Sequence, residues 1–115
     1  MIAILADDLT SALDGAAPFV ARGWPASVML QSGAAAAAAA GDAIVLSLDL
    51  DSRTRSSSDA RQRFSEAARQ MRGASMVYKT VDSTLRGHLG AETQATLEAA
   101  GLRHAVVAPA FPAAG

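Results

Sequence analysis

A short stretch in the second half of the chain concentrates side chains that could do chemistry. It reads VYKTVDSTLRGHLGAE and covers residues 77–92. A lysine, an aspartate, two hydroxyl side chains and an arginine follow closely on one another, at Lys79, Asp82, Ser83, Thr84 and Arg86. A plain surface loop needs only to be soluble, and any polar mixture achieves that. The crowding of these particular residue types therefore indicates a binding site.

Three cations in this part of the chain and upstream of it could bind an anionic ligand. Arg53, Lys79 and Arg86 can each pair with a carboxylate or a phosphate, and an arginine can do so through two parallel hydrogen bonds. We expect a helix to begin at Leu85. Its first backbone N–H groups and its dipole would add to the attraction for an anion.

Three aspartates complement these cations. Asp7 and Asp8 lie together near the N-terminus, and Asp82 lies within the stretch itself. Their carboxylates can accept hydrogen bonds from the hydroxyl groups of a ligand. A site whose cations bind a carboxylate and whose aspartates bind hydroxyls would suit a sugar acid. The same set of residues would suit a phosphate with magnesium equally well. Structural roles compete with both, because Asp7-Asp8 also suits a helix N-cap and Lys79 also suits an ordinary surface position.

Strands and helices alternate along the sequence and would bring these side chains together. Short apolar runs predict strands at 2–6, 26–30, 43–48, 75–79 and 104–108. Helical spacing of apolar residues predicts helices at 10–22, 56–72 and 85–100, and the alanine run at 34–40 also favours a helix. This alternation predicts an α/β fold: a three-layer Rossmann-like domain whose mainly parallel sheet of about five strands is flanked by helices.

The functional residues follow the predicted strands. Asp7 and Asp8 come after the first strand, Arg53 comes after the third, and the charged stretch comes after the fourth. Open parallel sheets bind ligands beyond the carboxyl ends of their strands, so we expect one site assembled from several strand ends. Gly87 and Gly90 lie where the predicted helix opens, a place where glycine is costly. They indicate close approach of the backbone to a ligand or a neighbouring strand.

Composition and charge exclude several classes of protein. The chain has 115 residues, half of them hydrophobic, which suits one folded domain. A net charge of −1 gives no general attraction to nucleic acid or to an anionic membrane. The lack of cysteine excludes disulfides and thiolate metal sites, and it favours a cytoplasmic location. We expect neither a signal peptide nor a membrane span.

The motifs resemble those of the four-carbon acid sugar kinases, which phosphorylate tetronates such as erythronate, threonate or their 3-oxo forms with ATP. The matching segments are ADDLTSALD, DSR, YKTVDSTLRGHLGAE and VVAPAFPAAG, in matching order over essentially the whole chain. The specific part is KxxDSTLRG with APAFP downstream, whereas ADDLT alone would be weak. Ser11 is a departure, because the family usually has glycine at that position.

The resemblance implies how this chain fits into a larger protein. Residues 1–115 would be a partial N-terminal substrate-binding domain, and the C-terminal nucleotide-binding domain would be absent. The sequence stops where the family continues, so we expect a truncated chain that binds a small-molecule sugar acid and is inactive alone. ATP and Mg²⁺ are implied for the intact protein, with neither bound by this chain alone. The missing kinase domain would be its partner, and a homo-oligomer is one option for the intact protein.

The resemblance also implies which residues meet the substrate. It places Asp8, Arg53, Lys79, Asp82, Ser83 and Arg86 at the sugar acid. The strand-end argument adds Asp7, and the cost of glycine at a helix start adds Gly87. Arg86 would clamp the carboxylate, with help from Arg53 or Lys79. The general base stays unassigned, with Asp8, Asp82 and a residue of the missing half as candidates. No metal ligand and no cofactor-binding residue is expected in this chain.

Two other interpretations remain open. A response-regulator receiver domain is a parallel α/β domain of similar size, and its acidic and hydroxyl positions could be filled by Asp7-Asp8, by Asp49 or Asp51, and by Thr80. The fifth predicted strand lacks the lysine that a receiver carries there, and the loop after the fourth strand would have no role. The second interpretation is a non-catalytic truncated remnant, since a partial sheet exposes apolar edges.

Overall fold

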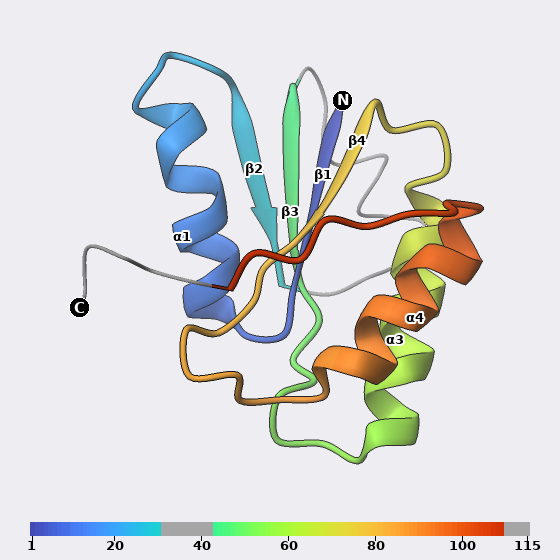
Figure 1. Ribbon diagram of the computed structural model, residues 1–115. Coiled ribbons are helices and arrows are strands. Elements are labelled where there is room, and N and C mark those ends of the chain that lie inside the picture. Colours follow the sequence, from blue (N-terminus) through green and yellow to red (C-terminus); the bar gives the residue numbers. More distant parts are fainter. Residues whose placement is uncertain (31–42, 110–115) are drawn as a thin grey trace.

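Four strands form one parallel sheet in the computed structural model, which describes residues 1–30 and 43–109 (Figure 1). The strands are β1 (Ile2–Ala6), β2 (Ala26–Met29), β3 (Val45–Asp49) and β4 (Met76–Lys79), and their order in the sheet is β2-β3-β1-β4. Neighbouring strands pair in parallel throughout this sheet. The predicted α/β class with a parallel sheet is confirmed, with four strands instead of about five.

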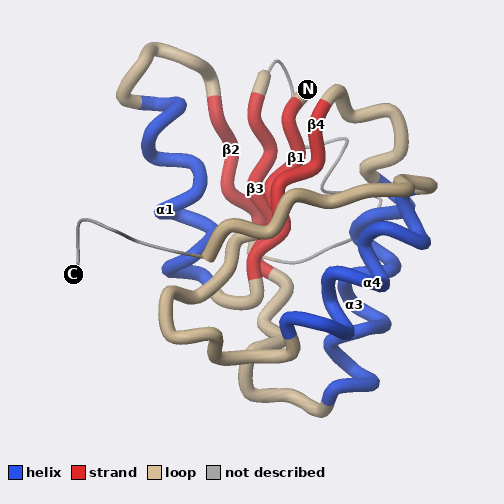
Figure 2. The backbone as a smooth tube through the Cα atoms, in the orientation of Figure 1, coloured by secondary structure: helices blue, strands red, loops and turns tan. Residues whose placement is uncertain are grey.

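Helices cover both faces of the sheet. α1 (Leu9–Val20) packs on one face, and α3 (Ser57–Gln70) and α4 (Leu89–Ala100) pack side by side on the other (Figure 1, Figure 2). The predicted three-layer arrangement is thereby confirmed. No helix within residues 1–30 and 43–109 is long and apolar enough to cross a membrane.

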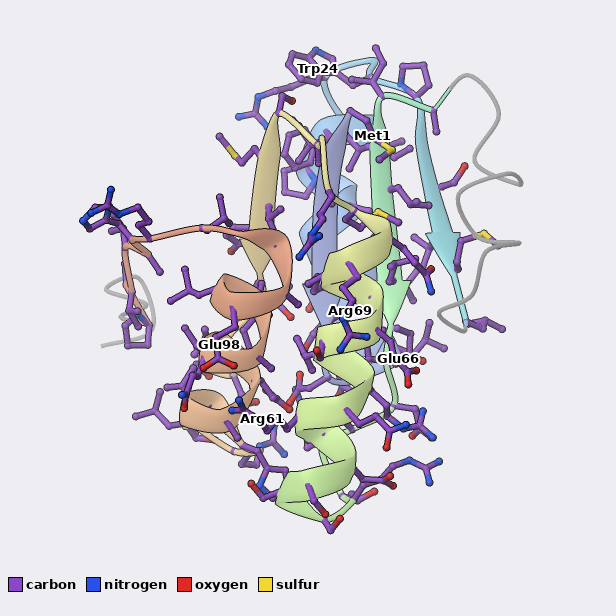
Figure 3. The ribbon with its side chains drawn as sticks, turned by 90° about the vertical axis from the view of Figure 1, so that its right-hand side faces the viewer. Met1, Trp24, Arg61, Glu66, Arg69 and Glu98 are labelled. Atoms are coloured by element: carbon purple, nitrogen blue, oxygen red, sulfur yellow. The ribbon has the colours of Figure 1, made fainter. Side chains whose placement is uncertain are left out.

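The larger core lies between the sheet and the helix pair α3 and α4. Successive residues of a strand point to opposite faces, so Ala3 and Leu5 of β1 face this core while Ile4 faces α1. Phe64 of α3 is completely buried at its centre. At the surface of the same helix pair, Arg61 and Glu98 form an ion pair at 2.6 Å that joins α3 to α4 (Figure 3). The sheet and these helices form the scaffold that positions the strand ends.

Residues 104–108 do not form the predicted fifth strand. Each of them is exposed, and the exposed fraction of Val106 is 97%. A cavity of about 630 Å³ lies between this segment and β4, so neither backbone hydrogen bonds nor apolar burial can stabilise a strand there. The apolar run is typical of a buried strand, but such a run becomes a strand only where a partner strand lies beside it.

The helix that the sequence predicts from Leu85 begins at Leu89 instead. Leu85 and Gly87 have φ angles of 60° and 90°, which a right-handed helix cannot contain. Two backbone N–H groups of this loop donate to the carboxylate of Asp82. The sequence predicted free N–H groups at a helix start, where they could bind an anion. These two N–H groups are instead bonded to Asp82.

The other predicted elements agree with the structure to within about two residues at each end. For example, the helix predicted at 56–72 is α3. Its N-cap is Ser56, whose hydroxyl accepts a hydrogen bond from the N–H of Asp59. The alanine run at 34–40 lies outside the described residues.

Candidate functional site: a charged cluster at the strand ends

The carboxyl ends of β1 and β3 lie where the connections of the sheet diverge. β1 leads into α1 on one face, whereas its neighbour β3 leads into α3 on the opposite face (Figure 1). Open parallel sheets bind ligands at this kind of switch point. Asp7 and Asp8 follow β1 and Arg53 follows β3, so the topology delivers their side chains to one place.

Arg53 is the centre of the cluster. Its Nε donates to Asp7 Oδ2 at 2.8 Å and its Nη2 donates to Asp7 Oδ1 at 2.9 Å, so two parallel hydrogen bonds hold this carboxylate. The guanidinium also donates to Asp8 and, at 3.0 Å, to the hydroxyl of Ser11. The hydrogen bond to Asp7 and the neighbouring carboxylates raise the pKa of Arg53, although burial opposes this. Arg53 thus ties the connection after β3 to the end of β1.

Asp8 combines a structural role with its place in the cluster. It is the N-cap of α1, and its Oδ1 accepts a hydrogen bond from the N–H of Ser11 at 2.8 Å. Burial alone would raise the pKa of Asp8, but the hydrogen bonds from Ser11 and the charge of Arg53 outweigh burial and lower it. The capping role that the sequence suggests is confirmed, and Asp8 carries its negative charge at neutral pH.

The loop after β4 adds Asp82 and Arg86 at the same edge of the sheet. Arg86 donates to Asp82 through Nε at 3.1 Å and through Nη2 at 2.6 Å. Nη2 of Arg53 lies 3.9 Å from Asp82 Oδ1, and this contact joins the loop to the strand ends of β1 and β3. Hydrogen bonds from Arg86 and Thr84 hold the pKa of Asp82 far below its usual range.

Arg86 is the accessible cation of the site. Its side chain is 65% exposed, against 16% for Arg53 and 11% for Lys79. Its partner Asp82 is only 8% exposed, but Asp82 also accepts hydrogen bonds from Thr84 and lies beside Arg53, so its charge is not left without partners when Arg86 moves. Arg86 can therefore turn from Asp82 toward an incoming anion, whereas Arg53 is largely buried and holds Asp7 through two hydrogen bonds.

Gly87 lies against Asp7, which explains the glycine. A Cβ atom built at residue 87 would lie 2.9 Å from Asp7 Oδ2, and the φ of 90° is one that other residues rarely adopt. The close approach expected from the sequence is therefore to a carboxylate of the site. Gly90, by contrast, has open space around it.

Lys79 and Ser83 lie beside the cavity next to β4 and not in the cluster around Arg53. The ammonium of Lys79 pairs with Glu92 at 2.9 Å and donates to the carbonyl of Thr80 at 3.0 Å. Within the described residues, neither side chain has a hydrogen bond or an ion pair to the cluster. The structure therefore brings together six of the predicted residues, namely Asp7, Asp8, Arg53, Asp82, Arg86 and Gly87, and sets Lys79 and Ser83 apart.

The sequence argument assigned no role to Ser52 or Glu92, and it noted Ser11 only as a departure from the family. The hydroxyl of Ser52 donates to Glu92 Oε1 at 2.8 Å, and both side chains are buried. One pattern in the sequence could have found Glu92, because it shares helical spacing with the buried residues Ala95 and Ala99 of α4. A glutamate on an otherwise small and apolar helix face must have a buried partner.

Comparison with known proteins matches the chain to one family. The model of the family described as "Sugar-binding N-terminal domain" matches residues 2–115. A D-threonate kinase from Cupriavidus necator is 45% identical, and the match covers 97% of this chain and 26% of that kinase. A D-erythronate kinase from Heliobacterium modesticaldum is 37% identical, over 99% of this chain and 27% of that kinase. The chain thus spans about a quarter of the length of the curated relatives it matches.

A solved structure has the same fold. It is the crystal structure of a domain of unknown function from Bordetella bronchiseptica, with bound citrate and as a domain-swapped dimer. The TM-score is 0.78 at 37% sequence identity, and the match covers 85% of this chain and 25% of that chain. The likeness therefore extends over most of the sheet and helices described above.

Proposed function

Because this chain belongs to the family of sugar-binding N-terminal domains, we propose that it is the sugar-acid-binding part of an ATP-dependent kinase acting on a tetronate or 3-oxo-tetronate. The cluster of two arginines and three aspartates at the ends of β1, β3 and β4 carries this proposal. Guanidinium groups suit the carboxylate of a sugar acid, and aspartates suit its hydroxyls. The names of the curated relatives, kinases of D-threonate and D-erythronate, support the same ligand class.

Binding of the acid proceeds by an exchange of ion-pair partners. In the free chain, Asp82 occupies the guanidinium of Arg86. The ligand carboxylate takes that place and forms two parallel hydrogen bonds with Arg86. Asp82 is then free to accept a hydrogen bond from a ligand hydroxyl, and Asp8, whose side chain is 30% exposed, accepts another. Arg53 keeps both strand ends in position while this happens.

Asp8 and Asp82 orient the hydroxyls and are poor candidates for the general base. A general base works best when its pKa lies near the working pH. The hydrogen bonds and charges described above lower the pKa of both carboxylates, which makes them weak bases at neutral pH. We place the base in the part of the longer protein that lies outside this chain.

The described residues do not fit a magnesium site. Residues 1–30 and 43–109 contain no group of three potential metal-ligating side chains. The carboxylates of Asp7, Asp8 and Asp82 are already bonded to arginines. In this proposal, residues 1–115 are the partial substrate-binding domain, and ATP and Mg²⁺ belong to the remaining three-quarters of a longer protein. The domain-swapped dimer from Bordetella bronchiseptica supports a homo-oligomer, and ATP use supports a cytoplasmic location.

The receiver-domain alternative has less support. Its phosphoacceptor would be Asp49 or Asp51. Asp51 is paired with Arg55 on the surface, whereas burial and the neighbouring carboxylates of Asp51, Asp8 and Asp7 raise the pKa of Asp49. The family match covers nearly the whole chain and names a sugar-binding domain. A remnant without acid binding stays an outcome that the following experiment decides.

Calorimetric titration of the chain with D-threonate, D-erythronate and the neutral polyol threitol tests the proposal. We expect binding of an acid and none of threitol, because the carboxylate supplies the charge that Arg86 recognises. Arg86→Ala should weaken acid binding by roughly tenfold or more, since hydrogen bonds to a charged group are the strong ones. Arg61→Ala is the matched control, because Arg61 is an exposed arginine whose ion pair is with Glu98 of α4 and not with a residue of the cluster.

Two results would count against the proposal. Equal binding of threonate and threitol would show that Arg86 does not recognise the carboxylate. Unchanged affinity in Arg86→Ala would show the same. A folded chain that binds no tetronate at all would identify it as a remnant.

A further inference from the structure

A buried ion pair connects the elements that carry the cluster, and the proposed function makes no use of it. Glu92 lies in the first turn of α4 and is 1% exposed, and Lys79 lies at the end of β4. Glu92 Oε2 is 2.9 Å from Lys79 Nζ, and Glu92 Oε1 accepts a hydrogen bond from Ser52 Oγ at 2.8 Å. One carboxylate thus binds α4, the end of β4 and the connection after β3.

The bonds of Lys79 point into the protein. An ammonium group has three N–H donors and no acceptor. Nζ of Lys79 contacts Glu92 and the carbonyl of Thr80, and it also lies 5.0 Å from the ring centroid of Phe64, within range of a cation–π interaction. The charge of Lys79 is therefore neutralised and surrounded inside the fold, so it is not available to an acid in the way that Arg86 is.

Ser52 transmits the position of Glu92 to Arg53. The side chain of Ser52 is completely buried on Glu92, and its backbone N–H donates to the carbonyl of Asp7 at 2.9 Å. The N–H of Arg53 donates to the same carbonyl at 3.1 Å. These restraints on consecutive residues determine the direction in which the Arg53 side chain leaves the main chain, toward Asp7 and Asp8.

We infer that Glu92 is a positioning residue of the acid-binding site, which orients Arg53 through Ser52 and withholds Lys79 from the ligand. Glu92 itself does not touch the acid. This inference rests on the proposed function and deepens it, because it assigns recognition of the carboxylate to Arg86 and removes Lys79 from the contact set. The buried network, with each partner satisfied, rigidifies the strand ends before the ligand arrives.

A double-mutant cycle tests this inference. The variants are Glu92→Gln, Lys79→Met, the double variant of both, and the matched control Glu98→Gln, which alters an exposed glutamate of the same helix. Two quantities are measured, the dissociation constant of the tetronate and the hydrogen-exchange rate of the Arg53 Nε–H by NMR. The exchange rate reports the orientation of Arg53 even when no ligand is present.

Each single variant should weaken acid binding about tenfold and accelerate exchange of the Arg53 Nε–H, because it leaves one buried charge without its partner. In Glu92→Gln, Lys79 and Ser52 compete for the single oxygen of the glutamine amide. The double variant should recover both quantities to within about threefold, since no unpaired charge remains and Ser52 alone donates to that oxygen. Glu98→Gln should change neither. If the ion pair were merely structural, its loss would lower the stability of the fold without changing the exchange rate of the Arg53 Nε–H.

The inference is overturned if Lys79→Met and the double variant both lose acid binding while the Arg53 exchange rate is unchanged, because Lys79 would then contact the acid itself. Behaviour of Glu92→Gln like that of Glu98→Gln would also overturn it. Should the charge variants fail to fold, Ser52→Ala keeps the ion pair and removes only the link, and an unchanged exchange rate there overturns the inference. If the unaltered chain binds no tetronate, the proposed function fails, and the exchange rates still decide the role of Glu92.

Discussion

At the scale of single residues, the ionic bonds of the cluster couple its stability to pH. Asp82 has its pKa lowered, first by the hydrogen bond from Arg86 and then by those from Thr84. Asp8 has a lowered pKa as well, since Ser11 and Arg53 together outweigh the effect of burial. Protonating either carboxylate breaks bonds that exist only in the folded chain. Acid should therefore loosen the strand ends.

The acid sensitivity of the fold should decrease in Asp82→Asn. The unfolded chain has an Asp pKa of about 3.9, and the folded pKa of Asp82 is lower. A depressed folded pKa stabilises the fold above the unfolded value, and this contribution is lost as the pH falls through the folded value. Urea unfolding at pH values between about 5 and about 2 should show a steeper loss of stability in the unaltered chain than in the variant.

Asp14→Asn is the control for this experiment, because Asp14 is exposed on α1 and has no ion pair in the described part of the chain. Its stability should fall with pH as steeply as that of the unaltered chain. Parallel curves for Asp82→Asn and the unaltered chain would show that the bonds from Arg86 do not stabilise the fold.

The meeting of Asp7 and Arg53 was predictable from the sequence, but the bonding partners of the charges and the separate position of Lys79 and Ser83 were not. Asp7 and Arg53 follow strands of one parallel sheet, and such strands end at one edge, so their meeting follows from the pattern. The sequence suggested three cations directed at one ligand. In the structure Arg53 binds Asp7 and Lys79 binds Glu92, because the partner of a charge depends on which loops meet.

At the scale of elements, the loop between β4 and α4 decides the shape of the site. Periodic apolar residues predicted a helix from Leu85, yet Leu85 has a φ of 60°, at a steric cost of roughly 1–2 kcal/mol for a residue with a Cβ atom. Asp82 offsets this cost by accepting from the hydroxyl and N–H of Thr84 and from the N–H of Arg86. Apolar spacing carries no information about φ, so the first turn of the predicted helix was wrong.

Substitutions of two glycines that lie three residues apart in this region should have opposite effects on stability. Gly87→Ala forces an alanine into a positive φ and a Cβ atom within 2.9 Å of Asp7 Oδ2, which Arg53 holds in place. The free energy of unfolding should fall by about 1–2 kcal/mol or more. Gly90→Ala meets open space inside α4 and should raise it by up to about 1 kcal/mol.

Urea unfolding of both variants at neutral pH measures this difference, and tetronate affinity provides a second observable. Gly87→Ala should also weaken acid binding, because it displaces Asp7 and with it Arg53. A Gly87→Ala chain as stable as Gly90→Ala would show that residue 87 does not press on the site.

The fifth predicted strand shows a different limit of sequence-based reasoning. The apolar run at 104–108 has the composition of a buried strand, but a cavity separates it from the outer edge of β4. Met76 and Tyr78 of β4 remain 57% and 51% exposed at this edge. Pairing depends on what lies beside a segment, and a single sequence does not contain that information.

At the scale of the whole molecule, the proposed function assigns to this chain one half of what phosphoryl transfer requires. Such transfer depends mainly on holding the acceptor hydroxyl and the nucleotide phosphate in line. In that proposal the arginines and aspartates at the strand ends bind the acceptor, and the chain spans about a quarter of each of the two curated relatives named above. In the proposed function, the remaining part of a longer protein brings the phosphate to the exposed strand ends.

A chimera tests this division of labour directly. This chain would replace the matching 26% of the Cupriavidus necator D-threonate kinase, to which it is 45% identical. We expect ATP-dependent phosphorylation of a tetronate by the chimera and none by the chain alone, because positioning requires both parts. Arg86→Ala in the chimera should raise KM for the acid by roughly tenfold or more, since the carboxylate clamp lies in this chain. Arg61→Ala should leave KM unchanged, because Arg61 only joins α3 to α4 at the surface. A folded chimera that binds ATP yet phosphorylates no tetronate would show that this chain does not supply the acid site.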